Sequence, residues 1–302
     1  MSQEMLGQAI EAVYSRLAAG SLALSDVVSS SELTLGTPRH WMTALMLKKG
    51  VEDDDARMLR FFRKEHGAIL DIGAYWGYLA ASFRNAGATS PIVSFEPLPA
   101  HHACLDELRR IDGNYDFAPF ALGDKSETVT LYGPVVNGKA LLGLNSVDGR
   151  IFHQHYSFYK EHLLSLHGGE IADAPSYKVQ LLATPFLTHR LDDVLAGRRL
   201  FGLLQPFRVD TRRIAVIKLD VEGYEANVLK GATKTLARQK PFIMVEEGNR
   251  NAEVAAILTA AGYRYAEREG LKLVEKTGHS SVLNGFWFHA ERAGEYAALG
   301  LF

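Results

Sequence analysis

The spacing of apolar residues near the start of the chain is that of a helix. Apolar positions recur there mostly at intervals of three and four, which places them on one helical face. They are Leu6, Ile10, Val13, Tyr14 and Leu17. We therefore predict a helical extension over residues 1–65. Its apolar face must pack either on the main domain or on a second subunit, so a homodimer through the N-terminal helices is one of two expectations.

From residue 66 the pattern changes to short apolar runs that alternate with amphipathic stretches. The runs predict strands and the stretches between them predict helices. This alternation is typical of an α/β fold with a mostly parallel, doubly wound sheet, and we predict one domain over residues 66–302 that ends in an antiparallel pair. The predicted strands are Ala68–Asp71, Pro91–Phe95, Tyr115–Leu122, Glu127–Gly133, Ile214–Asp220 and Pro241–Glu247, with later helices at 224–238 and 253–261.

The periodicity fades between residues 134 and 184, where glycines and aromatic residues are frequent. We predict an insertion or lid over the sheet edge. Its histidines suit an acceptor pocket better than a metal site, because His162 and His167 fit no single helical face, and we predict no metal ligands. The predicted substrate-binding residues are Asn145, His153, His155 and, outside the insertion, Glu246.

Composition restricts the classes of function. With 302 residues, 47% hydrophobic and 23% charged, the chain is typical of a soluble globular protein. Its net charge of -2 and pI near 6.6 offer no basic field for nucleic acid. No apolar run is long enough to span a membrane, and no signal-peptide pattern is evident. The single cysteine, Cys104, rules out an internal disulfide, and we expect a cytoplasmic protein.

A glycine-bearing turn, D-I-G-A-Y-W-G, follows the first predicted strand. Gly73 and Gly77 stand where small residues allow the backbone to approach a ligand at the carboxyl edge of the sheet. The next strand ends at Glu96, whose carboxylate can accept hydrogen bonds from both hydroxyls of a ribose. The two features together predict a site for an adenosine compound.

Asp71 indicates which adenosine compound is bound. The dinucleotide motif G-x-G-x-x-G has glycine where this chain has Asp71, and a carboxylate there repels a pyrophosphate. S-adenosylmethionine carries a sulfonium and an ammonium group in place of the phosphates. The turn therefore favours S-adenosylmethionine as cofactor and argues against a dehydrogenase.

A second cluster of charge occurs where a later strand meets its helix. Lys218, Asp220, Glu222 and Glu225 lie within eight residues of one another, and the carboxyl end of the strand should face the same crevice as the glycine turn. Glu225 could simply lie near the positive end of the helix dipole. A lysine in an apolar strand is costly unless it is paired, so we predict that Lys218 acts with Asp220 or Glu222.

Six motifs occur in a fixed order: DIGAYWGY, SFEPLP, FALGDKSETVTLY, HRLDDVL, IKLDVEGYEANVLKGA and PFIMVEE. Through them, residues 50–250 resemble the FkbM family of S-adenosylmethionine-dependent methyltransferases. The resemblance implies a Rossmann-like class I methyltransferase fold and methyl transfer, most often to a hydroxyl of a sugar or secondary metabolite. One position departs from the family pattern. Tyr75, followed by Trp76, stands where the family turn usually has asparagine, so a side-chain amide contact with the cofactor is lost.

The resemblance also implies roles for individual residues. Asp71, Gly73 and Gly77 are expected to hold the methionine end of the cofactor, and Glu96 the ribose. The adenine is expected at Ala121 and Leu122 through backbone and apolar contacts. Ala74, Tyr75 and Pro97 complete the predicted cofactor site, and Lys218, Asp220 and Glu222 are the predicted catalytic residues at the reaction centre.

Two alternatives remain open at the level of sequence. A divalent ion held by Asp220, Glu222 and Glu246 could lower the pKa of an acceptor hydroxyl. The chain could also be a non-catalytic nucleoside-binding module whose N-terminal helices recruit a partner, because a fold does not imply a function. For direct transfer, we expect the alignment of the reacting groups to matter more than proton removal.

Overall fold

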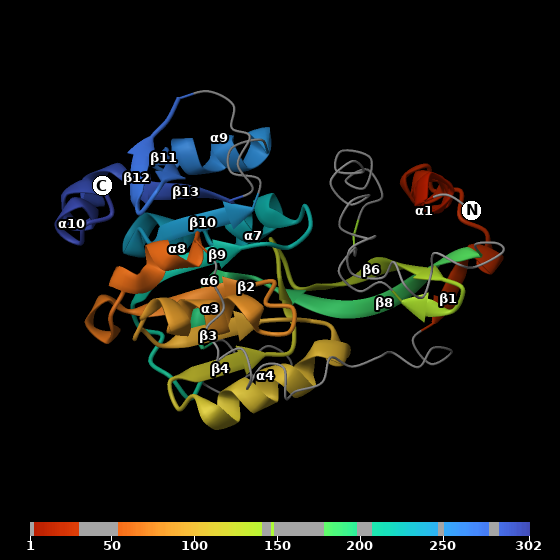
Figure 1. Ribbon diagram of the computed structural model, residues 1–302, viewed down its shortest axis with the longest axis horizontal. Coiled ribbons are helices and arrows are strands. Elements are labelled where there is room, and N and C mark those ends of the chain that lie inside the picture. The colour runs from red at the N-terminus through yellow and green to blue at the C-terminus, as the bar shows by residue number, and fades with distance from the viewer. Residues whose placement is uncertain are drawn as a thin grey trace. The chain divides into compact units, whose positions relative to one another are not determined.

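The computed structural model describes residues 3–29, 54–140, 146–147, 178–197, 207–246, 251–277 and 284–302. The chain divides into two compact units (Figure 1). One comprises residues 1–36 and 128–186, and the other comprises residues 37–127 and 187–302. The N-terminal helix thus shares a unit with the residues around the predicted insertion. This division differs from the predicted one, which placed a single boundary between residues 65 and 66.

The larger unit is built on an eight-stranded sheet in the order β12-β11-β13-β10-β9-β2-β3-β4. The five strands from β10 to β4 are parallel, and β13 lies antiparallel between β10 and β11. This confirms the predicted doubly wound sheet with an antiparallel terminal strand. The bounds are β2 Ala68–Ile72, β3 Ile92–Phe95, β4 Tyr115–Ala118, β9 Ile214–Leu219, β10 Phe242–Glu246, β11 Tyr263–Glu269, β12 Lys272–Glu275 and β13 Asn284–His289.

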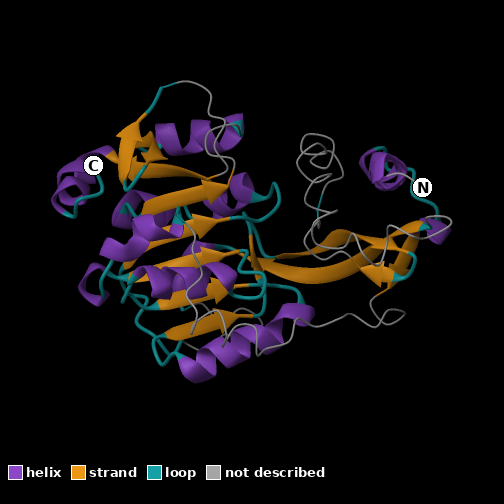
Figure 2. Ribbon diagram, viewed as in Figure 1, coloured by secondary structure: helices purple, strands orange, loops and turns teal. Residues whose placement is uncertain are grey.

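Helices cover both faces of this sheet (Figure 2). Successive side chains of a strand point to opposite faces, so Ile69 belongs to one core cluster and Leu70 to the other. Each face therefore has its own apolar core. The helices in the described part of this unit are η3 Ala56–Phe61, η4 Lys64–His66, α3 Tyr78–Ala86, α4 Pro99–Ile111, α6 Leu191–Leu195, α7 Glu225–Gly231, α8 Thr233–Gln239, α9 Ala252–Ala260, η6 Ala290–Arg292 and α10 Ala293–Ala298.

The predicted strand over Tyr115–Leu122 is wrong as a single element. It divides into β4 and β5 (Ala121–Leu122), and β5 pairs with β8 (Val179–His189) in a second sheet. Pro119 lies between the two pieces. Because proline has no N–H group for the ladder, it explains why pairing with β3 ends there.

The predicted helix over residues 224–238 also divides, into α7 and α8. The carboxylate of Asp192 accepts hydrogen bonds from the N–H groups of Lys234 at 2.8 Å and Thr235 at 2.9 Å, which satisfies the free donors at the start of α8. A Cβ on Gly231 would lie 1.9 Å from the carbonyl oxygen of Gly123. Contacts from elsewhere in the fold thus set both the end of α7 and the start of α8.

The smaller unit contains α1 (Gln3–Ala18), η1 (Leu24–Asp26), β1 (Val27–Ser29), β7 (Lys139–Ala140) and most of β6 (Glu127–Val136) and β8. The predicted first helix is confirmed, but β1 shows that residues 1–65 are not helical throughout. Ile10, Val13 and Tyr14 are buried, in one core cluster with Val136 and Leu181. The described part of the apolar face of α1 is therefore covered by strands of its own chain.

No described helix combines the length and apolar character needed to cross a bilayer.

Candidate active site

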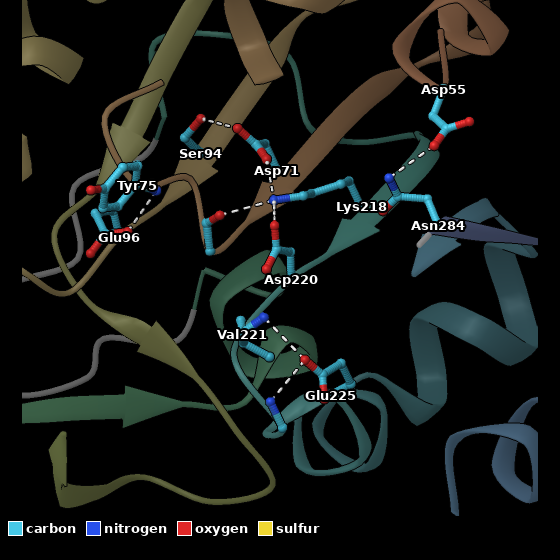
Figure 3. Close-up of polar contacts among 12 residues, drawn as sticks. Asp55, Asp71, Tyr75, Ser94, Glu96, Lys218, Asp220, Val221, Glu225 and Asn284 are labelled. Atoms are coloured by element: carbon cyan, nitrogen blue, oxygen red, sulfur yellow. Dashed lines mark hydrogen bonds and ion pairs between the residues drawn. The ribbon is translucent and has the colours of Figure 1, made fainter. Parts of the chain in front are cut away.

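The carboxyl edge of the large sheet gathers polar side chains from neighbouring strands, and ligands bind at this edge in folds of this type. Strand pairing aligns Asp71 of β2 with Ser94 of β3 and with Lys218 of β9. Asp220 directly follows β9, and Glu246 is the last residue of β10. Figure 3 shows a continuous series of contacts from Ser94 to Asp71, from Asp71 to Lys218 and from Lys218 to Asp220.

Lys218 connects the glycine turn with the carboxylates. Its Nζ donates a hydrogen bond to the carbonyl oxygen of Gly73 at 2.9 Å and lies 3.2 Å from Asp220 Oδ2 and 3.5 Å from Asp71 Oδ1. Burial disfavours the charged ammonium, but attraction to Asp220 and Asp71 outweighs burial and raises the pKa of Lys218. The predicted pairing with Asp220 is confirmed. Because Lys218 is buried and cationic, it can position these groups but cannot act as a base.

Asp71 lies beneath the turn rather than on its surface. It is 0% exposed, and its Oδ2 accepts a hydrogen bond from Ser94 Oγ at 3.1 Å. Burial raises its pKa, and the charge of Lys218 and the hydrogen bond from Ser94 oppose that rise. In this arrangement Asp71 supports the turn from below, and its contact with the methionine end of a cofactor stays a prediction.

Asp220 and Glu246 form a hydrogen-bonded pair of carboxyl groups. Burial raises the pKa of Glu246 well above its usual value, and the charges of Asp220 and Glu222 raise it further. Burial acts in the same direction on Asp220, but Lys218 and the hydrogen bond with Glu246 outweigh burial and lower the pKa of Asp220. The cation of Lys218, 3.2 Å from Asp220, therefore favours the negative charge on Asp220 and the proton on Glu246.

Asn284 stands opposite Glu246 across the β10 and β13 pair. Its side chain donates a hydrogen bond to Asp55 Oδ2 at 3.0 Å, and the other oxygen of Asp55 accepts one from Arg268 at 2.6 Å. Figure 3 shows the contact between Asp55 and Asn284. Residues just before η3 are thereby attached to the strand next to Glu246.

The turn after β9 is held by Glu225. Its Oε1 accepts hydrogen bonds from the N–H groups of Val221 and Gly223, both at 3.1 Å. Between them, Glu222 has a left-handed backbone with φ of 51°. Glu225 thus has a structural role at the start of α7, and the turn that it organises presents Glu222 at the sheet edge.

The glycines of the first turn are required by contacts within the protein. A Cβ on Gly73 would lie 1.7 Å from the carbonyl oxygen of Asp220, and one on Gly77 would lie 2.2 Å from Leu108 Cδ1. Both have a left-handed φ, of 80° and 87°. We expected these glycines to allow close approach of a ligand, but the close approach in the structure is to the end of β9 and to α4.

Glu96 joins the turns that follow β2 and β3. Its Oε2 accepts a hydrogen bond from the N–H of Tyr75 and its Oε1 accepts one from the N–H of Leu98, both at 2.8 Å. His101 Nδ1 lies 3.3 Å from Oε1. A carboxylate has about four lone-pair positions, so each oxygen keeps capacity for a ligand hydroxyl. The ribose contact stays a prediction.

The remaining predicted cofactor residues differ in exposure. Ala74 and Leu122 are buried, with 3% and 1% of their surface exposed. Pro97 and Ala121 are half-buried. Ala74 and Leu122 therefore offer little surface to a ligand, whereas Pro97 and Ala121 retain accessible surface. Asn145, His153 and His155 lie outside the described residues.

Two residues of the site, Ser94 and His101, were not predicted from the sequence. Ser94 is a polar residue in a buried apolar strand, and this contrast is a signal that could have identified it. His101 is 1% exposed in the middle of the site, but histidine on a helix carries no such signal. Across the described segments, no three histidine, cysteine or acidic side chains are arranged to hold a metal ion.

The glycine turn, the acidic end of β3 and the Lys218 cluster all lie within a single family match. The Methyltransferase FkbM domain matches residues 71–265, which is more than half of the chain. The chain belongs to the FkbM methyltransferase family. S-adenosylmethionine is accordingly its cofactor, as the sequence resemblance implied. A search of curated proteins found no match.

Similar solved structures include other methyltransferases. The FkbM methyltransferase from Methylobacillus flagellatus KT is 13% identical with a TM-score of 0.41, and the match covers 83% of this chain and 59% of that one. An O-methyltransferase from Bacillus cereus in complex with SAH is 15% identical with a TM-score of 0.32, covering 93% and 89%. Precorrin-6y C5,15-methyltransferase from Geobacter metallireducens GS-15 is 11% identical, with a TM-score of 0.32 and coverage of 85% and 92%.

S-adenosylmethionine suits the polar groups at the carboxyl edge of the large sheet. Glu96 can accept from ribose hydroxyls, and the carboxylates of Asp220 and Glu222 favour a ligand that carries positive charge. A sulfonium and an ammonium group meet that requirement, whereas a pyrophosphate does not. The residues present therefore fit S-adenosylmethionine.

Proposed function

We propose that this protein is an O-methyltransferase that acts on a hydroxyl of a sugar or another small metabolite. The observation that carries the proposal is the Asp220–Glu246 pair beside the cofactor turn. Asp220 has a third of its side chain exposed, and its backbone packs directly on Gly73 of that turn. An ionised carboxylate in this position is suited to receive the proton of an acceptor hydroxyl.

Each charged residue has a separate task in this proposal. S-adenosylmethionine, when bound, supplies a methyl group that is already activated by its sulfonium. Asp220 takes the proton that the acceptor oxygen releases as that oxygen becomes methylated. Glu246 keeps its own proton and holds Asp220 by a hydrogen bond. Lys218 fixes Asp220 against the turn through its contacts with both.

Positioning is expected to contribute more than proton transfer. Holding two reactants in line can supply about 7–11 kcal/mol, whereas a general base adds about 10²–10⁴-fold, or ~3–5 kcal/mol. Loss of the Asp220 carboxylate should therefore slow the reaction strongly without abolishing it.

The test is methyl transfer to a panel of acceptors, followed by mass spectrometry of the product and measurement of S-adenosylhomocysteine. The panel contains matched hydroxyl and amine compounds. We expect methylated hydroxyl products, and Asp220→Asn should lower kcat by about 10²–10⁴-fold. Asp210→Asn is the matched control, because Asp210 precedes β9 at the opposite end of the strand and pairs with Arg212 on the surface. Methylation of amines alone, or an unchanged kcat in Asp220→Asn, would contradict the proposal.

A further inference from the structure

Tyr75 adopts a backbone conformation that is unusual for its residue type. Its φ is 52°, in the left-handed region, which asparagine tolerates far better than bulky residues do. This explains why asparagine is common at this position of the family turn. A left-handed backbone is strained for tyrosine, so other contacts must hold it there.

Two contacts hold Tyr75 in place. Its N–H donates to Glu96 Oε2 at 2.8 Å, and its ring meets the ring of His101 edge to face, with 4.3 Å between the centroids. His101 is 1% exposed, and neither of its ring nitrogens has a hydrogen-bond partner. His101, whose Nδ1 lies 3.3 Å from Glu96 Oε1, therefore supports the tyrosine ring through this edge-to-face contact. Tyr75 as a whole residue stays 37% exposed.

The exposed ring stands in a negative field. Burial raises the pKa of Tyr75, and the charges of Glu96 and Glu222 raise it further. The phenol is therefore neutral at physiological pH, and carboxylates from the turns after β3 and β9 lie near it. The face of an aromatic ring attracts a cation, and nearby carboxylates add to that attraction.

We propose that the ring of Tyr75 contacts the sulfonium of bound S-adenosylmethionine and lets the protein distinguish this cofactor from S-adenosylhomocysteine. The inference rests on the proposed methyl transfer, in which the first compound is consumed and the second is formed. Attraction between a cation and an aromatic ring is lost when the sulfur becomes a neutral thioether. Tyr75 thus favours binding of the donor and release of the product.

The experiment compares dissociation constants for the two compounds by calorimetry at fixed ionic strength. Tyr75→Phe keeps the ring and should retain the wild-type ratio of the two constants within about 2-fold. Tyr75→Asn and Tyr75→Gly remove the ring but suit the left-handed backbone, and should shift the ratio toward S-adenosylhomocysteine by about 2- to 30-fold. Trp76→Phe is the matched control in the same turn, since the Trp76 ring lies 6.1 Å from that of Tyr75, and should leave the ratio unchanged.

The outcomes separate this inference from the proposed function. If the ring-less variants change both affinities by the same factor, Tyr75 has only a structural role and the inference fails alone. If the wild-type protein binds neither compound, the proposed function and the inference fall together. A protein that binds both compounds with the expected ratios but methylates no hydroxyl overturns only the proposed function. Thermal unfolding of each variant identifies any that does not fold, and the second ring-less variant then provides the comparison.

Discussion

Gly73 and Asp220 are in direct backbone contact across the neighbouring strands β2 and β9. A Cβ on Gly73 would lie 1.7 Å from the carbonyl oxygen of Asp220, and Lys218 donates a hydrogen bond to the carbonyl of the same glycine. The turn assigned to the cofactor and the carboxylate assigned to the acceptor are therefore parts of one rigid arrangement. A substitution in the glycine turn should therefore alter the position of Asp220, and a substitution at Asp220 should alter the turn.

Gly73→Ala should destabilise the protein by about 2–4 kcal/mol, because it adds a clash with backbone to a left-handed conformation. Urea unfolding measures the loss. Gly87→Ala is the control, since Gly87 also has a left-handed φ, of 101°, but has open space around it. It should cost only about 1 kcal/mol. Equal losses in the two variants would show that the contact with Asp220 is not tight.

Lys218→Met should cost about 3–5 kcal/mol of stability, because it leaves the buried carboxylate of Asp71 and the partly exposed carboxylate of Asp220 without their cation. Lys230→Met tests a surface ion pair instead, since Lys230 and Glu253 are both largely exposed, and it should cost at most about 1 kcal/mol. Chemical denaturation of both variants checks the comparison. A Lys218→Met protein as stable as Lys230→Met would mean that the buried charges are compensated in another way.

Glu246 should make the protein lose stability as the pH rises from acid to neutral. Its pKa in the folded state lies above the value of 4.5 expected without the fold. Its contribution is therefore fully present below pH 4.5 and is lost as the pH rises through the folded pKa. Relative to Glu246→Gln, the wild-type protein should lose at most about 1.4 kcal/mol for each pH unit in that window.

The measurement for Glu246 is unfolding of both proteins at several pH values from 4 upward. The quantity compared is the difference in free energy of unfolding between wild type and Glu246→Gln. Glu253→Gln, an exposed substitution on α9, provides the baseline. A difference that stays constant over the whole range would mean that Glu246 does not carry the proton of the Asp220 pair.

Glu96→Ala should weaken S-adenosylmethionine binding by about 10- to 150-fold, which corresponds to ~1.5–3 kcal/mol from lost hydrogen bonds to a charged group. The variant also removes the acceptor for the N–H groups of Tyr75 and Leu98, so its unfolding temperature should fall. Asp106→Ala, on the exposed side of α4, should change neither quantity. Unchanged cofactor affinity in Glu96→Ala by calorimetry would contradict the ribose assignment.

Local patterns in the sequence determined the order of the strands and helices. The period of apolar residues is a property of neighbouring positions, so β2, β3, β9 and β10 could be located before their partners were known. The charges at Lys218 and Asp220 were recognisable for a related reason. A lysine in an apolar strand stands out in any fold, because burying it without a partner is costly.

Tertiary structure alone decided how these elements are used. The strand predicted at Tyr115–Leu122 divides because its second part finds a partner in β8, and Lys218 binds Asp71, which lies far away in sequence. The glycines at positions 73 and 77 are needed for contacts with Asp220 and Leu108, where the sequence suggested contact with a ligand. The physical reason is common to these cases. Residue type and spacing indicate how much free energy it costs to bury a residue or to place it in a given backbone conformation. The residue that offsets this cost is determined by how segments distant in sequence pack together.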